Sequence, residues 1–203
     1  MFMIRITTRN HIVFDGKNIP IFYHSFNCGQ KNTRTTERAI ELAIAQYWIA
    51  KNSDNLIEIG AVTPYYFPGL IRDIVDPSDK NEHVNIKKSL FDVTISGKNV
   101  VSISTIEHIG TGDYNLDTNE NCIDALNKIL NEANSLLITI PIGFNKILDE
   151  YIASHSFSKP ISVDVYFRSE KLNDWRHSSD TTLIKTITYG PLWANGIIII
   201  SKK

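Results

Sequence analysis

The stretch VVSISTIEHIGTGDYN, residues 100–115, begins as a run of small and apolar residues and changes abruptly at Glu107-His108 into a glycine-containing segment. A short run rich in Val and Ile, apolar at successive positions, is typical of a strand covered on both faces, as in a parallel sheet. The stretch therefore predicts a buried strand that delivers a carboxyl group and an imidazole to the loop after it.

Segments of the same character recur along the chain and alternate with helical patterns. Strands are predicted over 55–62, 70–76, 99–105, 135–143, 161–167 and 196–202, and helices over 36–50, 117–134 and 145–155. Asp117 and Glu120 have the spacing of a capping box ahead of the second helix. This alternation predicts an α/β fold with an open, mostly parallel sheet.

The N-terminal region carries a turn signal. In HIVFDGKNIPIFYH, residues 11–24, β-forming residues flank Asp15-Gly16, a pair that turns readily because glycine tolerates positive φ. We find no internal repeat, low-complexity tract or long linker. We therefore expect one domain over residues 1–203, with residues 1–35 forming an N-terminal hairpin or cap region.

Composition limits the class of protein. The net charge of −1 over 203 residues supplies no general attraction to phosphate backbones, so we expect no nucleic-acid partner. Cys28 and Cys122 lack metal-ligand spacing and suit a reducing, cytoplasmic setting. No apolar stretch approaches the ~20 residues that span a bilayer, so we expect no membrane insertion. His24 and His177 also lack metal-ligand spacing, and we predict no metal.

Polar residues end several of the predicted strands. In open α/β sheets the functional crevice lies beyond the carboxyl ends of the strands. Glu58 and Gly60 end one strand, Asp76 ends the next, and Ser104–His108 and Pro141–Asn145 end two others. An acid in the position of Asp76 is suited to accept hydrogen bonds from two ribose hydroxyls. The sequence therefore predicts a site for a small ligand that contains a nucleoside.

These residues also carry a resemblance to a known family. The segments NLIEIGAV, DIVDP, VVSISTIEHIG, LLITIPIGFNKILDE and ANGIIIISKK, with ERAIE on the first helix, resemble in order and spacing a class I S-adenosylmethionine-dependent methyltransferase. More narrowly, they are similar to small bacterial members with an STxEHIG motif that are often associated with surface-polysaccharide gene clusters. The resemblance covers roughly residues 36–203. It implies a Rossmann-like class I methyltransferase fold, with helices on both faces of a mostly parallel sheet.

The resemblance also implies an activity and a set of site residues. The activity would be methyl transfer from S-adenosylmethionine to a hydroxyl of a small molecule or glycan, in surface-polysaccharide biosynthesis. Arg38 would meet the methionine carboxylate and Glu37 its amino group, while Asp76 would bind the ribose. The implied cofactor-binding residues are Glu37, Arg38, Glu58, Gly60, Asp76, Ser89, Ser104 and Thr105, and the implied catalytic residues are His108 and Glu107.

For a hydroxyl acceptor, catalysis consists of alignment with the methyl group and removal of a proton. His108 is the natural base, because its ordinary pKa of about 6.5 lies near physiological pH. Adjacent residues of an extended chain point in opposite directions, so we expect one of Glu107 and His108 to face the site and the other a helix cap. His108 could instead cap the loop. Tyr65, Tyr66 and Tyr114 are candidates for the pocket wall.

The loop after Glu58 departs from the family pattern. Ala61, Val62 and Thr63 stand where glycines are expected, and Pro64 and Pro68 shorten the helix that follows. This departure favours an alternative, a non-catalytic methyltransferase-like protein that has lost or altered cofactor binding and serves as a partner in glycan assembly. Besides the small-molecule or glycan acceptor, the partners considered for the chain are a second copy of itself and a glycan-assembly protein. A nucleotide-sugar or dinucleotide enzyme is a third class, weakened by the absence of G-x-G-x-x-G after the first of these strands.

Overall fold

The computed structural model of the chain describes residues 11–21, 36–113, 120–158, 160–168, 175–191 and 193–202. His24, Cys28, Tyr114 and Asp117, for which the sequence analysis made predictions, lie outside these ranges.

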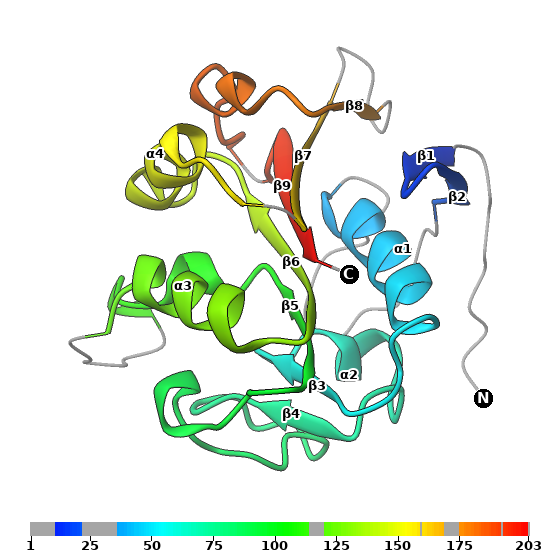
Figure 1. Ribbon diagram of the computed structural model, residues 1–203, viewed down its shortest axis with the longest axis vertical. Coiled ribbons are helices and arrows are strands. Elements are labelled where there is room, and N and C mark those ends of the chain that lie inside the picture. Colours follow the sequence, from blue (N-terminus) through cyan, green and yellow to red (C-terminus); the bar gives the residue numbers. More distant parts are fainter. Residues whose placement is uncertain are drawn as a thin grey trace.

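A seven-stranded sheet forms the centre of the structure, in the order β4-β3-β5-β6-β9-β7-β8 (Figure 1). Its strands are β3 (Leu56–Ile59), β4 (Asp73–Val75), β5 (Asn99–Ile103), β6 (Ser135–Pro141), β7 (Ile161–Arg168), β8 (Trp175–Ser178) and β9 (Gly196–Lys202). The pairs β4–β3, β3–β5 and β5–β6 are parallel. The pairs β6–β9, β9–β7 and β7–β8 are antiparallel.

The predicted Rossmann-like class I methyltransferase fold, with its mostly parallel sheet, is therefore wrong. The sheet is mixed, and the described residues form only four α-helices, of which α2 (Thr63–Tyr66) has four residues. An apolar run reports burial on both faces and carries no information on strand direction. Ile197–Ile200 of β9 are fully buried although β9 runs antiparallel to both of its neighbours.

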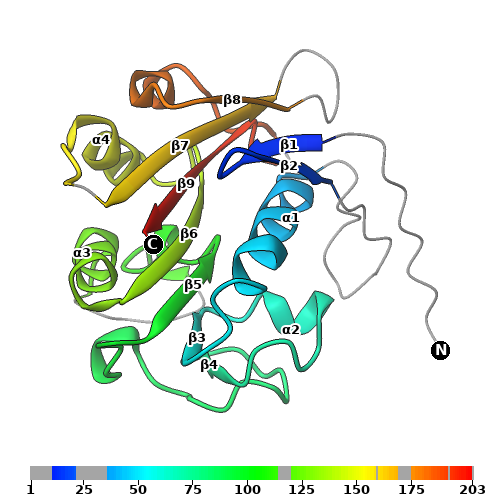
Figure 2. The ribbon, with the colours of Figure 1, turned by 45° about the vertical axis from the view of Figure 1, so that its right-hand side comes forward.

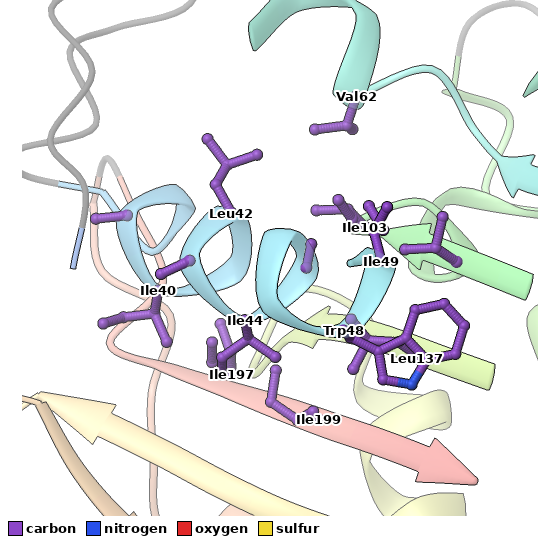
Figure 3. Packing of buried hydrophobic residues seen from close by; sticks show 14 of the residues in the cluster. Ile40, Leu42, Ile44, Trp48, Ile49, Val62, Ile103, Leu137, Ile197 and Ile199 are labelled. Atoms are coloured by element: carbon purple, nitrogen blue, oxygen red, sulfur yellow. The ribbon is translucent and has the colours of Figure 1, made fainter. Parts of the chain in front are cut away.

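The two faces of the sheet are covered differently. Helix α1 (Arg38–Ile49) lies on one face together with the hairpin β1-β2, and α3 (Cys122–Glu132) and α4 (Lys146–Ser154) lie on the other (Figures 1 and 2). Figure 3 shows the apolar side of α1, where Ile44 and Trp48 pack against strands β6 and β9. None of the helices in the described ranges is long and apolar enough to cross a membrane.

The N-terminal hairpin is confirmed where it is described. Strands β1 (His11–Phe14) and β2 (Lys17–Pro20) pair antiparallel, and the turn residues Asp15 and Gly16 have φ of 52° and 67°. Positive φ at both central residues is the requirement of the tight turn that matches strand twist. The Tyr166 hydroxyl of β7 donates to the Val13 carbonyl at 2.6 Å, which ties the hairpin to the sheet.

The cap of α3 differs from the prediction. The Asn121 side chain accepts a hydrogen bond from the Asp124 backbone N–H at 2.9 Å, so Asn121 caps the helix. Glu120 has another partner, since it accepts from the Ser89 hydroxyl at 2.5 Å. The N-cap is therefore Asn121, four residues after the Asp117 of the predicted capping box.

The parallel half of the sheet positions the site. Along the chain, β4 adds to one side of β3, and β5 then adds to the other side. Ligands of open sheets bind beyond the carboxyl ends of the strands at such a reversal. In this structure that place is the end of β3 and β5, between Gly60 and Ser104.

Candidate functional site

A cleft of about 630 Å³ opens at the carboxyl ends of the parallel strands. Its walls come from the start of α1, the β3–α2 loop, the turn after β4, the segment after β5 and the ends of β6 and of the β8–β9 connection. A smaller hollow of about 120 Å³ adjoins it and shares Asp76, Ser78, Thr105 and His108 with it. The reversal of strand order therefore coincides with a continuous, ligand-sized space.

The structure brings together nearly all of the residues predicted from the sequence. Those in the wall of the cleft or its hollow are Glu37, Arg38, Gly60, Asp76, Ser89, Ser104, Thr105, Glu107 and His108. Glu58 is the exception, because it is fully buried behind the wall.

Glu58 caps the short helix α2. Its Oε1 accepts hydrogen bonds from the backbone N–H groups of Val62 and Thr63 at 3.1 and 2.8 Å, and its Oε2 accepts one from the Thr63 hydroxyl. Pro64 fits beside it because the first turn of a helix needs no proline N–H. Burial raises the pKa of Glu58 to about 7, although these hydrogen bonds oppose the shift.

The raised pKa of Glu58 predicts a pH-dependent stability. Because the folded pKa of about 7 exceeds the ordinary 4.5, the stabilisation is complete below pH 4.5 and is lost as the pH rises towards 7. The shift corresponds to about 3 kcal/mol. Glu58→Gln, which keeps an acceptor for both N–H groups, should remove this component. Urea denaturation across the pH range should therefore show Glu58→Gln gaining on the wild type as the pH rises.

The exposed Glu82 supplies the matched control. Glu82→Gln should follow the wild-type pH profile of unfolding free energy, because the Glu82 side chain is exposed to solvent. A constant difference in unfolding free energy between Glu58→Gln and the wild type at all pH values would contradict the assignment.

Asp76 follows β4 and forms a tight polar turn. Its Oδ1 accepts hydrogen bonds from the Ser78 backbone N–H, the Ser78 hydroxyl and the Asp79 backbone N–H, at 2.9, 3.1 and 2.8 Å. All three bonds go to one oxygen, which fixes the carboxylate with Oδ2 outside this turn network. Asp79 in turn accepts from the Tyr65 hydroxyl at 2.9 Å, so α2 and the turn form one wall of the cleft.

A buried ionic cluster lies at the α1 end of the cleft, centred on Glu41. Glu41 Oε1 accepts from the Ser104 and Thr139 hydroxyls at 2.5 and 2.6 Å, and Oε2 lies 2.9 Å from Arg38 Nη1. Ser104 has φ of 43°, a left-handed conformation that is uncommon outside glycine. Glu41 therefore links α1 to β5 and β6 and holds the turn that leads to Glu107 and His108.

Sequence reasoning missed Glu41, although a signal was present. Glu41, Ile44 and Trp48 follow one another at spacings of three and four residues, which places the carboxylate on the apolar side of the helix. A charged residue in that position needs a buried partner.

Glu107 lies in the cleft wall as a fully buried acid. Both of its carboxylate oxygens lack a hydrogen-bond partner among the described residues. Burial raises the pKa of Glu107 well above its usual value, and the neighbouring Glu41 adds to the effect. The pKa of Glu37 is raised in the same way, by burial first and then by Glu41. A buried carboxyl without hydrogen bonds is costly, and a cation placed beside it would relieve that cost.

His108 forms a hydrogen-bonded pair with Asp113. Its Nδ1 lies 2.8 Å from Asp113 Oδ2, and its Nε2 lies 3.8 Å from Glu107 Oε1. The hydrogen bond from His108 is the main cause that lowers the pKa of Asp113. An ionised Asp113 only accepts hydrogen bonds, so His108 Nδ1 donates to it. In the neutral tautomer that carries this proton, Nε2 is the basic nitrogen.

The expectation that Glu107 and His108 point to opposite sides is wrong, because both line the cleft. Residues Ile106–His108 form a 3₁₀ turn instead of an extended strand, so alternation does not apply. Asp113 was missed because the loop that returns it to His108 has no recognisable sequence pattern.

Aromatic side chains complete the outer part of the cleft. The ring of Phe144 lies 4.4 Å from that of His108 and 6.0 Å from that of Tyr189, measured between centroids. Tyr65 and Tyr189 line the cleft, whereas Tyr66 is part of the hydrophobic core. Of the two described tyrosines predicted for the wall, only Tyr65 is therefore placed there.

The chain was compared with protein-family models, curated proteins and solved structures. No family model, curated protein or solved structure gives a significant match to the chain. Within the described ranges, no group of three or more His, Cys, Asp or Glu side chains could hold a metal ion.

Proposed function

We propose that the protein is an S-adenosylmethionine-dependent methyltransferase acting on a hydroxyl of a small molecule or glycan, in cytoplasmic surface-polysaccharide biosynthesis. The observation that carries the proposal is the set of carboxyl groups in the cleft wall. Among the described residues, Glu37, Asp76, Asp79 and Glu107 line the cleft together with a single arginine, Arg38. Such a lining favours a cationic ligand that also carries one carboxylate.

The residues present fit this cofactor in kind. Arg38 pairs with Glu41 through Nη1, and its guanidinium has further N–H donors suited to a carboxylate. The half-buried Glu37 and the buried Glu107 suit an ammonium or sulfonium group. Asp76 Oδ2 suits ribose hydroxyls. Gly60 allows Thr105 to pack closely against the end of β3, because a Cβ atom at Gly60 would lie 2.0 Å from Thr105 Oγ1. When bound, S-adenosylmethionine would supply an electrophilic methyl group.

His108 is the proposed general base. Its Nε2 would accept the proton of the acceptor hydroxyl as the oxygen attacks the methyl carbon, and Asp113 would stabilise the resulting imidazolium. Phe144, in ring contact with His108, would limit the positions of the imidazole. Removal of a positioned base costs about 10²- to 10⁴-fold in rate.

A non-catalytic binding protein is the second candidate, and one observation favours it. Ala61 and Val62 contribute to the cleft wall where the family pattern has glycines, and Glu58 is used as a helix cap. In this candidate the cleft would hold a ligand without turnover.

Calorimetric titration with S-adenosylmethionine and S-adenosylhomocysteine, with NAD and UDP-glucose as controls, tests the proposal. We expect micromolar binding of the first two alone. Asp76→Asn keeps an acceptor at Oδ1 for the turn and should weaken binding about tenfold. Asp73→Asn is the matched control at the start of β4. Because Asp73 does not line the cleft, this variant should leave affinity unchanged.

Each alternative has a distinct outcome in these titrations. Binding of cofactor without turnover in an acceptor screen would favour the non-catalytic candidate. Binding of NAD or UDP-glucose in place of the first pair would overturn the proposal in favour of a nucleotide-sugar or dinucleotide enzyme.

A further inference from the structure

A second cavity, of about 480 Å³, lies at the opposite end of the parallel strands from the cleft. It is bordered by the starts of β5, β6 and β7, the end of β9 and the last turn of α1. The cleft contacts the first residues of α1, so the two spaces lie at opposite ends of this helix. We call the second space the amide pocket, after six of its lining residues: Asn52, Asn99, Asn134, Ser135, Ser162 and Ser201.

Hydrogen bonds hold these side chains in place before any ligand arrives. Asn99 donates to the Asp54 carbonyl at 2.8 Å, and its Oδ1 accepts from Asn134 Nδ2 and Ser135 Oγ at 3.0 and 2.7 Å. The hydroxyls of Ser162 and Ser201 are 2.8 Å apart. Since amides and hydroxyls both donate and accept, the wall presents both functions in a fixed arrangement.

The cation and both carboxylates of the amide pocket already have partners within the protein. Lys51 Nζ lies 3.3 Å from Asp15 Oδ2, and His177 Nε2 lies 2.6 Å from Asp164 Oδ1. Lys51 is the one cationic side chain among the described lining residues, and its partner is already in place. The pocket therefore offers no surplus positive charge to a phosphate or carboxylate, which argues against an anionic ligand.

Stacking contributes little in this pocket. The Tyr47 ring has Lys51 Nζ 4.1 Å from its centroid and meets the edge of the Phe14 ring at 6.1 Å, and Trp48 is buried. These aromatic groups are occupied by contacts within the protein. Recognition would instead use hydrogen bonds to a ligand that carries many donors and acceptors.

We propose that the amide pocket binds an uncharged saccharide. The hydroxyls of such a ligand donate and accept in close succession, which matches paired amides and serines. A volume of about 480 Å³ lies in the range of pockets for small ligands. The proposal is independent of the proposed methyl transfer, because no amide-pocket residue lines the cleft.

NMR of the whole, isotope-labelled chain tests the proposal through the side-chain amide signals of Asn52, Asn99 and Asn134. The probes are maltose, lactose and chitobiose, with digalacturonic acid as the charged counterpart. We expect at least one neutral disaccharide to shift these signals with a Kd on the order of 1 mM, without shifting signals of cleft residues. Digalacturonic acid should shift them less.

A pair of isosteric variants identifies the site. Asn134→Asp replaces the amide donors with a negative charge and should weaken binding at least about tenfold. Asn127→Asp makes the same change on α3, outside the amide pocket. The side-chain Oδ1 of Asn127 accepts a hydrogen bond from the Tyr151 hydroxyl, and an aspartate keeps that acceptor, so this variant should leave binding unchanged. Absence of shifts with all three neutral sugars, equal loss in both variants, or stronger binding of digalacturonic acid would each overturn the proposal.

Discussion

Replacing Gly60 with alanine is expected to destabilise the protein by roughly 2–6 kcal/mol. Gly60 has φ of +85°, which strains any residue with a side chain, and the new Cβ would lie 2.0 Å from Thr105 Oγ1 and 2.8 Å from Thr105 Cβ. The clash involves atoms next to the backbone, so side-chain rotation cannot remove it. Equilibrium urea denaturation measures the loss.

Gly97→Ala is the matched control for this prediction. Gly97 has a similar φ of +73°, but a Cβ there would have no atom within 4 Å. This variant should lose only the conformational part, about 1–2 kcal/mol. Equal losses of stability in the two variants would contradict the close approach of Thr105 to Gly60, at the ends of β5 and β3.

Replacing Glu41 with alanine is expected to cost about 3–5 kcal/mol, because it leaves the largely buried Arg38 without its partner. The hydroxyls of Ser104 and Thr139 lose their acceptor in the same step. Glu41→Gln keeps an oxygen for both hydroxyls and should lose less. Thermal and urea unfolding of the three proteins would give this order of stability.

A partly exposed ion pair on α3 provides the matched control for the Glu41→Ala variant. Glu132 pairs with Lys128 at 2.8 Å on α3, and Glu132→Ala should cost no more than about 1 kcal/mol. If Glu41→Ala were no more harmful than Glu132→Ala, the ionic cluster would not be a support of the turn at Ser104.

Much of the local structure could be predicted from apolar spacing. The predicted segments overlap β3, β4, β5, β6, β7 and β9 and helices α1, α3 and α4, and the Asp15-Gly16 pair marks the hairpin. Strand β8 was not predicted, because it has four residues and only Trp175 is buried. Strand direction was predicted wrongly, since β9 reads like a parallel strand and pairs antiparallel on both sides.

The candidate site was predictable in part, from the rule that polar residues ending parallel strands meet at one edge. That rule brought Asp76 and the segment from Ser104 to His108 together. It could not find Asp113, which depends on the path of a loop. It also placed Glu58 at the ligand, whereas backbone N–H groups of α2 use this carboxylate.

The sequence by itself determined which segments are buried and where polar groups interrupt them, because burial follows from local apolar content and spacing. Only the tertiary structure decided strand direction, the pairing of His108 with Asp113 and the burial of Glu41, Glu58 and Glu107. These features depend on contacts between residues far apart in the chain or on loop geometry. The free energy of a carboxyl group is set by the neighbours and the solvent that the fold provides, and those are absent from its local sequence.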